Sequence, residues 1–210
     1  MIRRPVLFVL AGVNGAGKSS IGGHLLEKAG LTWFNPDTFA RAWMAATGSE
    51  QGAANALAWQ EGMRRFDDAT GKKQNFAFET TLGGRTVVNK ILDATRQYDV
   101  MVWFCGLASP ELHIARVKAR VAVGGHDIPE AKIRERYPRA LENLLRLMPH
   151  LAHLQVYDNS VEAPIGGAVP DPKLLLEMER GRLTRPAPTD LKALQQTPDW
   201  AKPLLEAALP

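Results

Sequence analysis

The sequence has little cysteine and no long apolar run. Cys105 is the single cysteine among 210 residues, which excludes an internal disulfide framework or a cysteine-rich zinc site and fits a reducing, cytoplasmic compartment. No stretch approaches the roughly 20 apolar residues that a membrane-spanning helix needs. The run from Val6 to Ala11 is shorter than the core of a secretion signal and leads directly into glycines. We therefore expect a cytoplasmic protein without membrane association, and a buried first strand at 6–10.

The charge is neither strongly one-sided nor clustered. Lys and Arg number 26 against 22 Asp and Glu, for a formal net charge of +4 and a pI near 9.3. A basic pI permits nucleic-acid binding, but the basic residues are spread along the chain instead of forming one patch. No nucleic-acid partner is therefore expected. With 45% hydrophobic and 23% charged residues, the chain has the composition of an ordinary globular protein.

The segment from Gly12 to Ser19 carries the sharpest motif. It reads GVNGAGKS and matches G-x-x-x-x-G-K-[ST], in which glycines turn backbone N–H groups toward nucleotide phosphates and a helix begins behind them. An apolar strand precedes the motif and an amphipathic helix follows to about Ala29, which is the context that a working phosphate loop requires. Lys18 is expected to reach the β- and γ-phosphates, and the Ser19 hydroxyl to bind Mg²⁺. The residues expected to bind ATP in and after the loop are Gly12, Asn14, Gly15, Ala16, Gly17, Lys18, Ser19 and Ser20.

Apolar runs and helical periodicity alternate along the first three quarters of the chain. Strands are expected at 6–10, 31–35, 75–80, 100–105 and 154–157, with helices between them. This alternation predicts an α/β fold: a three-layer P-loop nucleoside-triphosphate hydrolase or kinase fold with a five-stranded parallel sheet. We expect that domain to span residues 1–162. Prolines are frequent after Pro164, so residues 163–210 are expected to form a proline-rich C-terminal extension with short helices near 173–180 and 191–195.

Arginines flank a glycine-rich break after the fourth predicted strand. Arg116 and Arg120 lie four residues apart and share a helix face, and Gly124-Gly125-His126-Asp127 then interrupts the helix. Arg134 and Arg136 do not share a face, so one of them is expected to point inward, with Arg134 favoured. Such a segment, about residues 121–136, suits a lid that closes over phosphates. Arg120 and Arg134 would then balance charge on the transferred group and Arg116 would bind nucleotide; the alternative is solvated helix charge.

Polar residues follow two predicted strands at the edge where the phosphate loop lies. Asp37 comes after the second strand in Asn35-Pro36-Asp37, where it can accept a proton from an attacking hydroxyl or cap a helix; the two roles are compatible. Glu79, Thr80 and Thr81 end the third strand and suit substrate hydroxyls or strand-end capping. His126 beside one aspartate is too little for a metal site and is better placed at a lid hinge. Residues 158–160 (DNS) suit either the adenine pocket or a plain turn.

Several motifs of other P-loop proteins are missing. The chain has no Asn-Lys-x-Asp guanine motif, no transporter-ATPase signature helix, and no apolar strand ending in the magnesium-binding aspartate, since Phe76-Ala77-Phe78 leads into Glu79. A small-molecule kinase using Mg-ATP is the favoured class. There are three alternatives. The first is a kinase of another hydroxyl acceptor, such as a nucleoside or an antibiotic. The others are a regulatory ATP-binding module with little turnover and a nucleic-acid kinase.

These pieces together resemble the zeta-toxin family of P-loop kinases, in its compact bacterial branch. The resemblance covers about Val6 to Ser160 and consists of LAGVNGAGKSS, NPDTFAR, FAFETTL, the GGHDIPE stretch with its flanking arginines, IRERY and DNS. The GGHDIPE stretch is the most distinctive piece, because a generic phosphate loop does not require it.

The resemblance implies an ATP-dependent kinase acting on the 3′-hydroxyl of a UDP-sugar, with UDP-N-acetylglucosamine favoured. It assigns phosphate binding to Lys18, the catalytic base to Asp37, substrate contacts to Glu79 and Thr81, and charge stabilisation to the lid arginines Arg120 and Arg134. It also implies a partner antitoxin that blocks the nucleotide site. One position departs from the family pattern. The better-known toxins have a basic residue where this chain has Gly83, and Arg85 is the candidate replacement.

Overall fold

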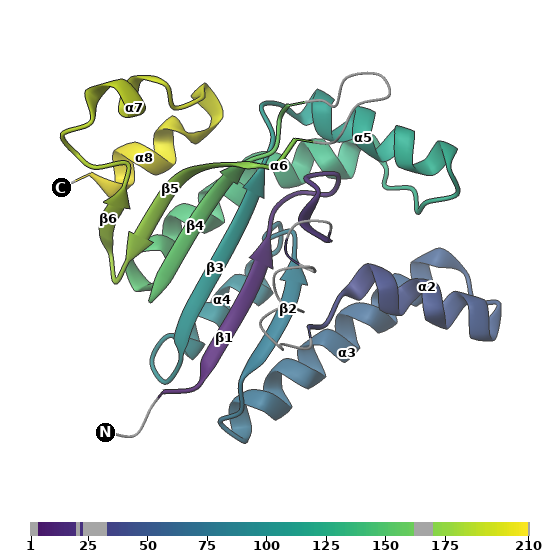
Figure 1. The fold of residues 1–210 in the computed structure, drawn as a ribbon. Helices are drawn as coiled ribbons and strands as arrows, with labels where there is room; N and C mark the ends of the chain where they lie inside the picture. Colours follow the sequence, from purple (N-terminus) through teal and green to yellow (C-terminus); the bar gives the residue numbers. More distant parts are fainter. Residues whose placement is uncertain (1–3, 20–21, 23–32, 162–169, 210) are drawn as a thin grey trace.

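A mixed β-sheet forms the centre of the molecule (Figure 1). The computed structural model describes residues 4–19, 22, 33–161 and 170–209, and within these residues six strands pair in the order β2-β1-β3-β4-β5-β6. The strands are β1 (Val6–Ala11), β2 (Phe76–Thr80), β3 (Asp99–Gly106), β4 (His153–Asp158), β5 (Lys173–Glu179) and β6 (Arg182–Arg185). The first four are parallel, and the last two are antiparallel. The expected α/β fold is confirmed, with a mixed sheet in place of five parallel strands.

The predicted strand at 31–35 is reduced to a single bridge in the part that the structure describes. Phe34 pairs in parallel with Phe78 of β2, while residues 31 and 32 lie outside the described ranges. The pairing ends there because Asn35 already caps the next helix, its Oδ1 accepting from the backbone N of Asp37 (2.9 Å) and of Thr38 (3.1 Å).

The short helix predicted near 173–180 is wrong. Lys173–Glu179 is β5, antiparallel to β4. Its residues, KLLLEME, are good helix formers, but helix propensity contributes only a few tenths of a kcal/mol per residue. Hydrogen bonding to the open edge of β4 therefore decides the conformation. Arg180 and Gly181, with φ of 46° and 77°, then form the two-residue turn to β6 that such a left-handed pair favours.

The other predicted helices are confirmed within a few residues. They are α2 (Pro36–Thr47), α3 (Gln51–Gly71), α4 (Arg85–Ala94), α5 (Pro110–Ala122), α6 (Glu130–Leu147) and α7 (Leu191–Gln195), with α8 (Lys202–Ala208) in addition. The helix expected from Gly17 to Ala29 lies mostly outside the described residues. Within this segment the structure describes Lys18, Ser19 and Gly22 as helical. Among the helices that the structure describes, none has the length and apolarity that crossing a membrane requires.

The main core lies on the sheet face that α4 and α6 cover (Figure 1). Trp200 and Leu204 near the C-terminus belong to this same core, and the Trp200 ring lies so close to Gly106 of β3 that a Cβ there would come within 2.3 Å. Side chains between residues 175 and 208 are therefore part of the core that the sheet forms with α4 and α6. A smaller cluster around Phe8 covers the opposite sheet face.

Candidate active site

The phosphate loop connects β1 to the helical residues Lys18 and Ser19. Gly12 and Gly15 have φ of 137° and 85°, a backbone conformation that L side chains rarely adopt. A Cβ at Gly12 would lie 2.2 Å from the Cys105 carbonyl oxygen. The motif glycines are thus required by both the turn and the close approach of β3.

Three hydrogen bonds from other elements hold the underside of this loop. The Gly12 amide donates to the Thr80 carbonyl (3.2 Å), and Asn159 Nδ2 donates to the Ala16 carbonyl (2.9 Å). His113 Nδ1 lies 2.9 Å from the Asn14 carbonyl. Burial lowers the pKa of His113 to about 4, so at neutral pH its uncharged imidazole donates this bond. The loop is therefore fixed before any ligand binds.

Lys18 and Glu79 form a buried ion pair at the centre of the site. Lys18 Nζ lies 3.2 Å from Glu79 Oε1, with side-chain exposures of 5% and 9%. Ser19 Oγ and Asn35 Nδ2 both donate to Glu79 Oε2, at 3.1 and 3.0 Å. Glu79 thus connects Lys18 and Ser19 of the glycine-rich loop to the end of β2, and Asn35 joins this network to the start of α2.

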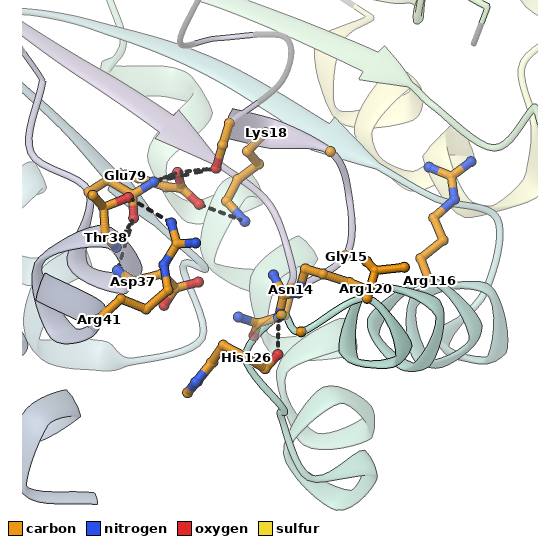
Figure 2. Close-up of a pocket in the computed structure, with 16 residues that line it drawn as sticks. Asn14, Gly15, Lys18, Asp37, Thr38, Arg41, Glu79, Arg116, Arg120 and His126 are labelled. Atoms are coloured by element: carbon orange, nitrogen blue, oxygen red, sulfur yellow. Dashed lines mark hydrogen bonds and ion pairs between the residues drawn. The ribbon is translucent and has the colours of Figure 1, made fainter. Parts of the chain in front are cut away.

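A cavity of about 490 Å³ opens above the loop (Figure 2). The α2 side contributes Asp37, Thr38 and Arg41, and the α5 side contributes Arg116, Arg120 and the turn from Val123 to His126. Arg120 Nη2 donates to the His126 carbonyl (2.6 Å), which holds the glycine-rich turn against α5. The loop residues that line this first cavity are Asn14, Gly15, Gly17, Lys18 and Ser19; Gly12 and Ala16 are buried beneath them.

A second cavity of about 490 Å³ adjoins the first. Four residues line both: Asn14, Asp37, Glu79 and His126. The remaining walls of the second cavity come from Phe34 before α2, from β2 and the following loop, and from α3 and α6. They include Ala58, Trp59, Met63, Thr80, Thr81, Gly83, Lys132, Arg136 and Arg139. Asp37 and Glu79 are the carboxylates that line both cavities, and Glu79 is ion-paired with Lys18.

The structure brings most of the sequence-predicted site residues together, with clear exceptions. Arg134 is exposed and ion-paired with Glu111 at 2.5 Å, and it lines neither cavity, because its face of α6 points to α5. Arg85 begins α4 and also lines neither cavity. Arg116 lines the first cavity and donates to the Val161 carbonyl (3.2 Å). Ser20 lies outside the described residues.

Arg136 is the arginine of α6 that faces the site: it lines the second cavity and contacts the phosphate loop, as neither Arg134 nor Arg85 does. Its Nη1 donates to Asn14 Oδ1 (2.7 Å), and its Cγ would lie 2.8 Å from a Cβ at Gly83. Burial lowers the pKa of Arg136, opposed by the charge of Asp37, but a guanidinium stays protonated in proteins. Helical spacing indicated that only one of the two arginines faces inward; it gave no information about which one.

Sequence reasoning also missed Arg41 and Trp59. Arg41 follows Asp37 by one helical turn and lines the first cavity. Trp59 lines the second cavity with half of its surface exposed. The available signals were the i, i+4 spacing of Arg41 from Asp37 and, for Trp59, a tryptophan directly before the polar residues Gln60 and Glu61 of α3.

The family follows from comparison with known proteins. The model of the family described as Zeta toxin matches residues 1–165, which include the phosphate loop, Asp37, Glu79, α5 and α6. The chain belongs to the zeta toxin family. An uncharacterized protein of Haemophilus influenzae is 28% identical over 127 residues, covering 60% of this chain and 88% of that protein.

Solved structures share the fold with this zeta toxin family member at low identity. The AvrRxo1-ORF1 complex with ORF2 and ATP superposes with a TM-score of 0.63 at 15% identity, covering 98% of this chain. The present chain spans 64% of the length of that matched chain. The PezAT toxin-antitoxin system of Streptococcus pneumoniae gives a TM-score of 0.54 at 15% identity, covering 74% of this chain and 68% of that chain. The fold is thus one that P-loop kinases use.

Proposed function

We propose that this chain is an ATP-dependent phosphotransferase whose acceptor is a hydroxyl of a UDP-sugar, with UDP-N-acetylglucosamine favoured. One observation carries the proposal: Asp37 lines both cavities, between the phosphate loop and a second chamber with room for an acceptor. A kinase needs this arrangement, in which a carboxylate meets the hydroxyl while cations hold the phosphates.

The reaction uses residues on both sides of the junction. Asp37 accepts the proton of the acceptor hydroxyl, whose oxygen forms a bond to the γ-phosphorus. The bond between that phosphorus and the β–γ bridging oxygen breaks, and ADP leaves with the electron pair. Lys18, Arg120 and Arg136 stabilise the negative charge on the phosphoryl oxygens. For this, the Lys18 ammonium group donates hydrogen bonds to the phosphates as well as to Glu79.

Magnesium fits the oxygen donors at the first cavity. Ser19 Oγ and Glu79 Oε2 lie 3.1 Å apart, and both are hard oxygen donors of the kind that Mg²⁺ takes beside nucleotide phosphates. Ser19 would hold the ion directly, and Glu79 directly or through water. When bound, it neutralises charge on the β- and γ-phosphates.

The second cavity has two chemically different parts. Phe34, Met63 and the half-exposed Trp59 offer apolar and aromatic surface, whereas Lys132, Arg136 and Arg139 of α6 line the wall with positive charge. An acceptor that combines a flat base with a diphosphate matches both, since bases stack on aromatic rings and guanidinium groups bind phosphate oxygens. This chemistry, together with membership of the zeta toxin family, favours a UDP-sugar.

A partner protein is part of the proposal. The PezAT system, which shares this fold, is a toxin-antitoxin system. We propose by analogy that the present chain is the toxin of such a pair and that its antitoxin covers the first cavity, where ATP would otherwise bind.

Incubation with γ-labelled Mg-ATP and separate pools of UDP-sugars, nucleosides and oligonucleotides tests the proposal. Label should enter the UDP-sugar pool. The Asp37→Asn variant should retain ATP affinity in calorimetry and lose transfer by about 10²- to 10⁴-fold, as expected for a missing general base. Label in another pool would overturn the assignment of a UDP-sugar as the acceptor. Normal transfer by Asp37→Asn would show that Asp37 is not the base. Tight ATP binding with no label in any pool would favour a regulatory module.

A further inference from the structure

Arg41 is a cation of the first cavity to which the reaction above gives no role. It lies on α2 one turn after Asp37, so both side chains share a helix face. It lines the first cavity but not the second. Its one hydrogen bond among the described residues runs from Nη2 to Thr38 Oγ1 (3.3 Å). Within that part of the chain, no carboxylate lies within ion-pair distance of its guanidinium.

The other cations of this cavity all have partners on their own side. Lys18 is paired with Glu79, Arg116 donates to a carbonyl after β4, and Arg120 donates to the His126 carbonyl. Arg41 approaches from the opposite wall (Figure 2). Its charge still acts on His126: burial chiefly lowers the pKa of His126, the charges of Asp37 and Asp127 oppose this, and the positive charges of Arg120 and Arg41 add to the lowering.

We infer that Arg41 is a catalytic residue that binds the γ-phosphoryl group during transfer. The inference rests on the proposed function, which places that group between Lys18 and Asp37. A phosphoryl group there meets Arg120 from α5 and, on its other side, the unneutralised guanidinium that stands one turn from the base. Arg120 and Arg41 on opposite sides, with Arg136 beside Asn14, suit the three equatorial oxygens, over which the negative charge of the transition state is spread. Arg41 therefore contacts the γ-phosphate, which ADP lacks. It makes no contact with the nucleoside or with the α- and β-phosphates.

Affinities for ATP and ADP, measured by calorimetry with magnesium present, separate this role from a structural one. Arg41→Ala should weaken ATP binding by about tenfold to a hundredfold, the usual effect of losing a charge-assisted hydrogen bond, and should leave ADP binding unchanged. Arg41→Lys should fall between, because an ammonium keeps the charge without the planar fork. Arg64→Ala is the matched control, since Arg64 is exposed on α3, pairs with Glu61 and lines neither cavity.

The outcomes are distinct. Equal weakening of ATP and ADP, or no weakening of either, would overturn the role of Arg41 while the wild-type chain still binds ATP and leaves the proposed function standing. Failure of the wild-type chain to bind ATP would overturn the proposed function itself, and the role of Arg41 with it. A thermal unfolding curve of Arg41→Ala that matches wild type excludes misfolding as the cause of a loss.

Discussion

Arg136 Nη1 of α6 donates a hydrogen bond to Asn14 Oδ1 of the phosphate loop at 2.7 Å. The two residues are 122 positions apart in the sequence, and the bond joins the helix after the glycine-rich turn to the loop that receives the nucleotide. Asn14 lines both cavities and Arg136 lines the second. The contact therefore places a positive charge beside the route that the phosphoryl group takes in the proposed reaction.

Arg136→Ala should reduce phosphoryl transfer by about 10²-fold or more, as loss of a charged donor at the transition state does. Arg134→Ala should have a far smaller effect, because Arg134 forms a surface ion pair with Glu111, and such pairs contribute little. Steady-state kinetics of the two variants make the comparison. A greater loss with Arg134→Ala would restore the assignment that the sequence favoured.

Gly83→Ala should impair transfer as well, through Arg136. A Cβ at Gly83 would lie 2.8 Å from Arg136 Cγ, whereas one at the neighbouring Gly84 would have no heavy atom within 4 Å. Neither glycine is among those with positive φ, so backbone strain does not distinguish them. We expect Gly83→Ala to lower kcat and Gly84→Ala to behave like wild type; similar kinetics of the two variants would contradict a displacement of Arg136.

Lys18→Met should abolish ATP binding and also destabilise the fold. It leaves the carboxylate of Glu79 buried without its cation, a change that costs about 3–5 kcal/mol of unfolding free energy. The double variant Lys18→Met/Glu79→Gln should regain most of that stability without regaining ATP binding. Urea unfolding and calorimetry measure the two properties. Lys72→Ala, which breaks the exposed pair with Asp68, should cost less than about 1 kcal/mol; an equal cost would mean that the Lys18–Glu79 pair behaves as a surface pair.

The buried His113 predicts a dependence of stability on pH. Its pKa is lowered by burial to about 4, against about 6.5 in an unfolded chain. The unfolded chain therefore binds a proton first as the pH falls, so this histidine's contribution is fully present above about pH 6.5 and is lost progressively toward pH 4. The loss amounts to roughly 3 kcal/mol.

His113→Gln should flatten that slope between pH 6.5 and 4, measured by urea unfolding at several pH values. His150→Gln, at an exposed histidine, is the control. An unchanged slope in His113→Gln would show that other groups produce the acid sensitivity.

Short-range patterns were enough to predict the glycine-rich loop after β1 and the start of α2. The glycines allow the backbone conformation of one short loop, in which Lys18 lies. Asn35-Pro36-Asp37 starts α2 through a cap that involves only neighbouring residues. The glycine-rich loop after β1 and the polar end of β2 lie together because parallel strands bring their carboxyl ends to one edge. The loop and the helix start need only the backbone preferences of a few adjacent residues, and the meeting of the strand ends needs only the rule that alternating strands and helices form a parallel sheet.

Tertiary structure alone decided which arginines face the site and how the sheet ends. Residues 134 and 136 lie about 200° apart around a helix, so the sequence separates their faces, but the rotation of α6 depends on what it packs against: Arg136 meets Gly83 and Asn14, and Arg134 meets Glu111. Likewise β5 is a strand because β4 presents an open edge to it. Local sequence determines which residues of a segment share a face. Contacts with distant segments determine which way each face points.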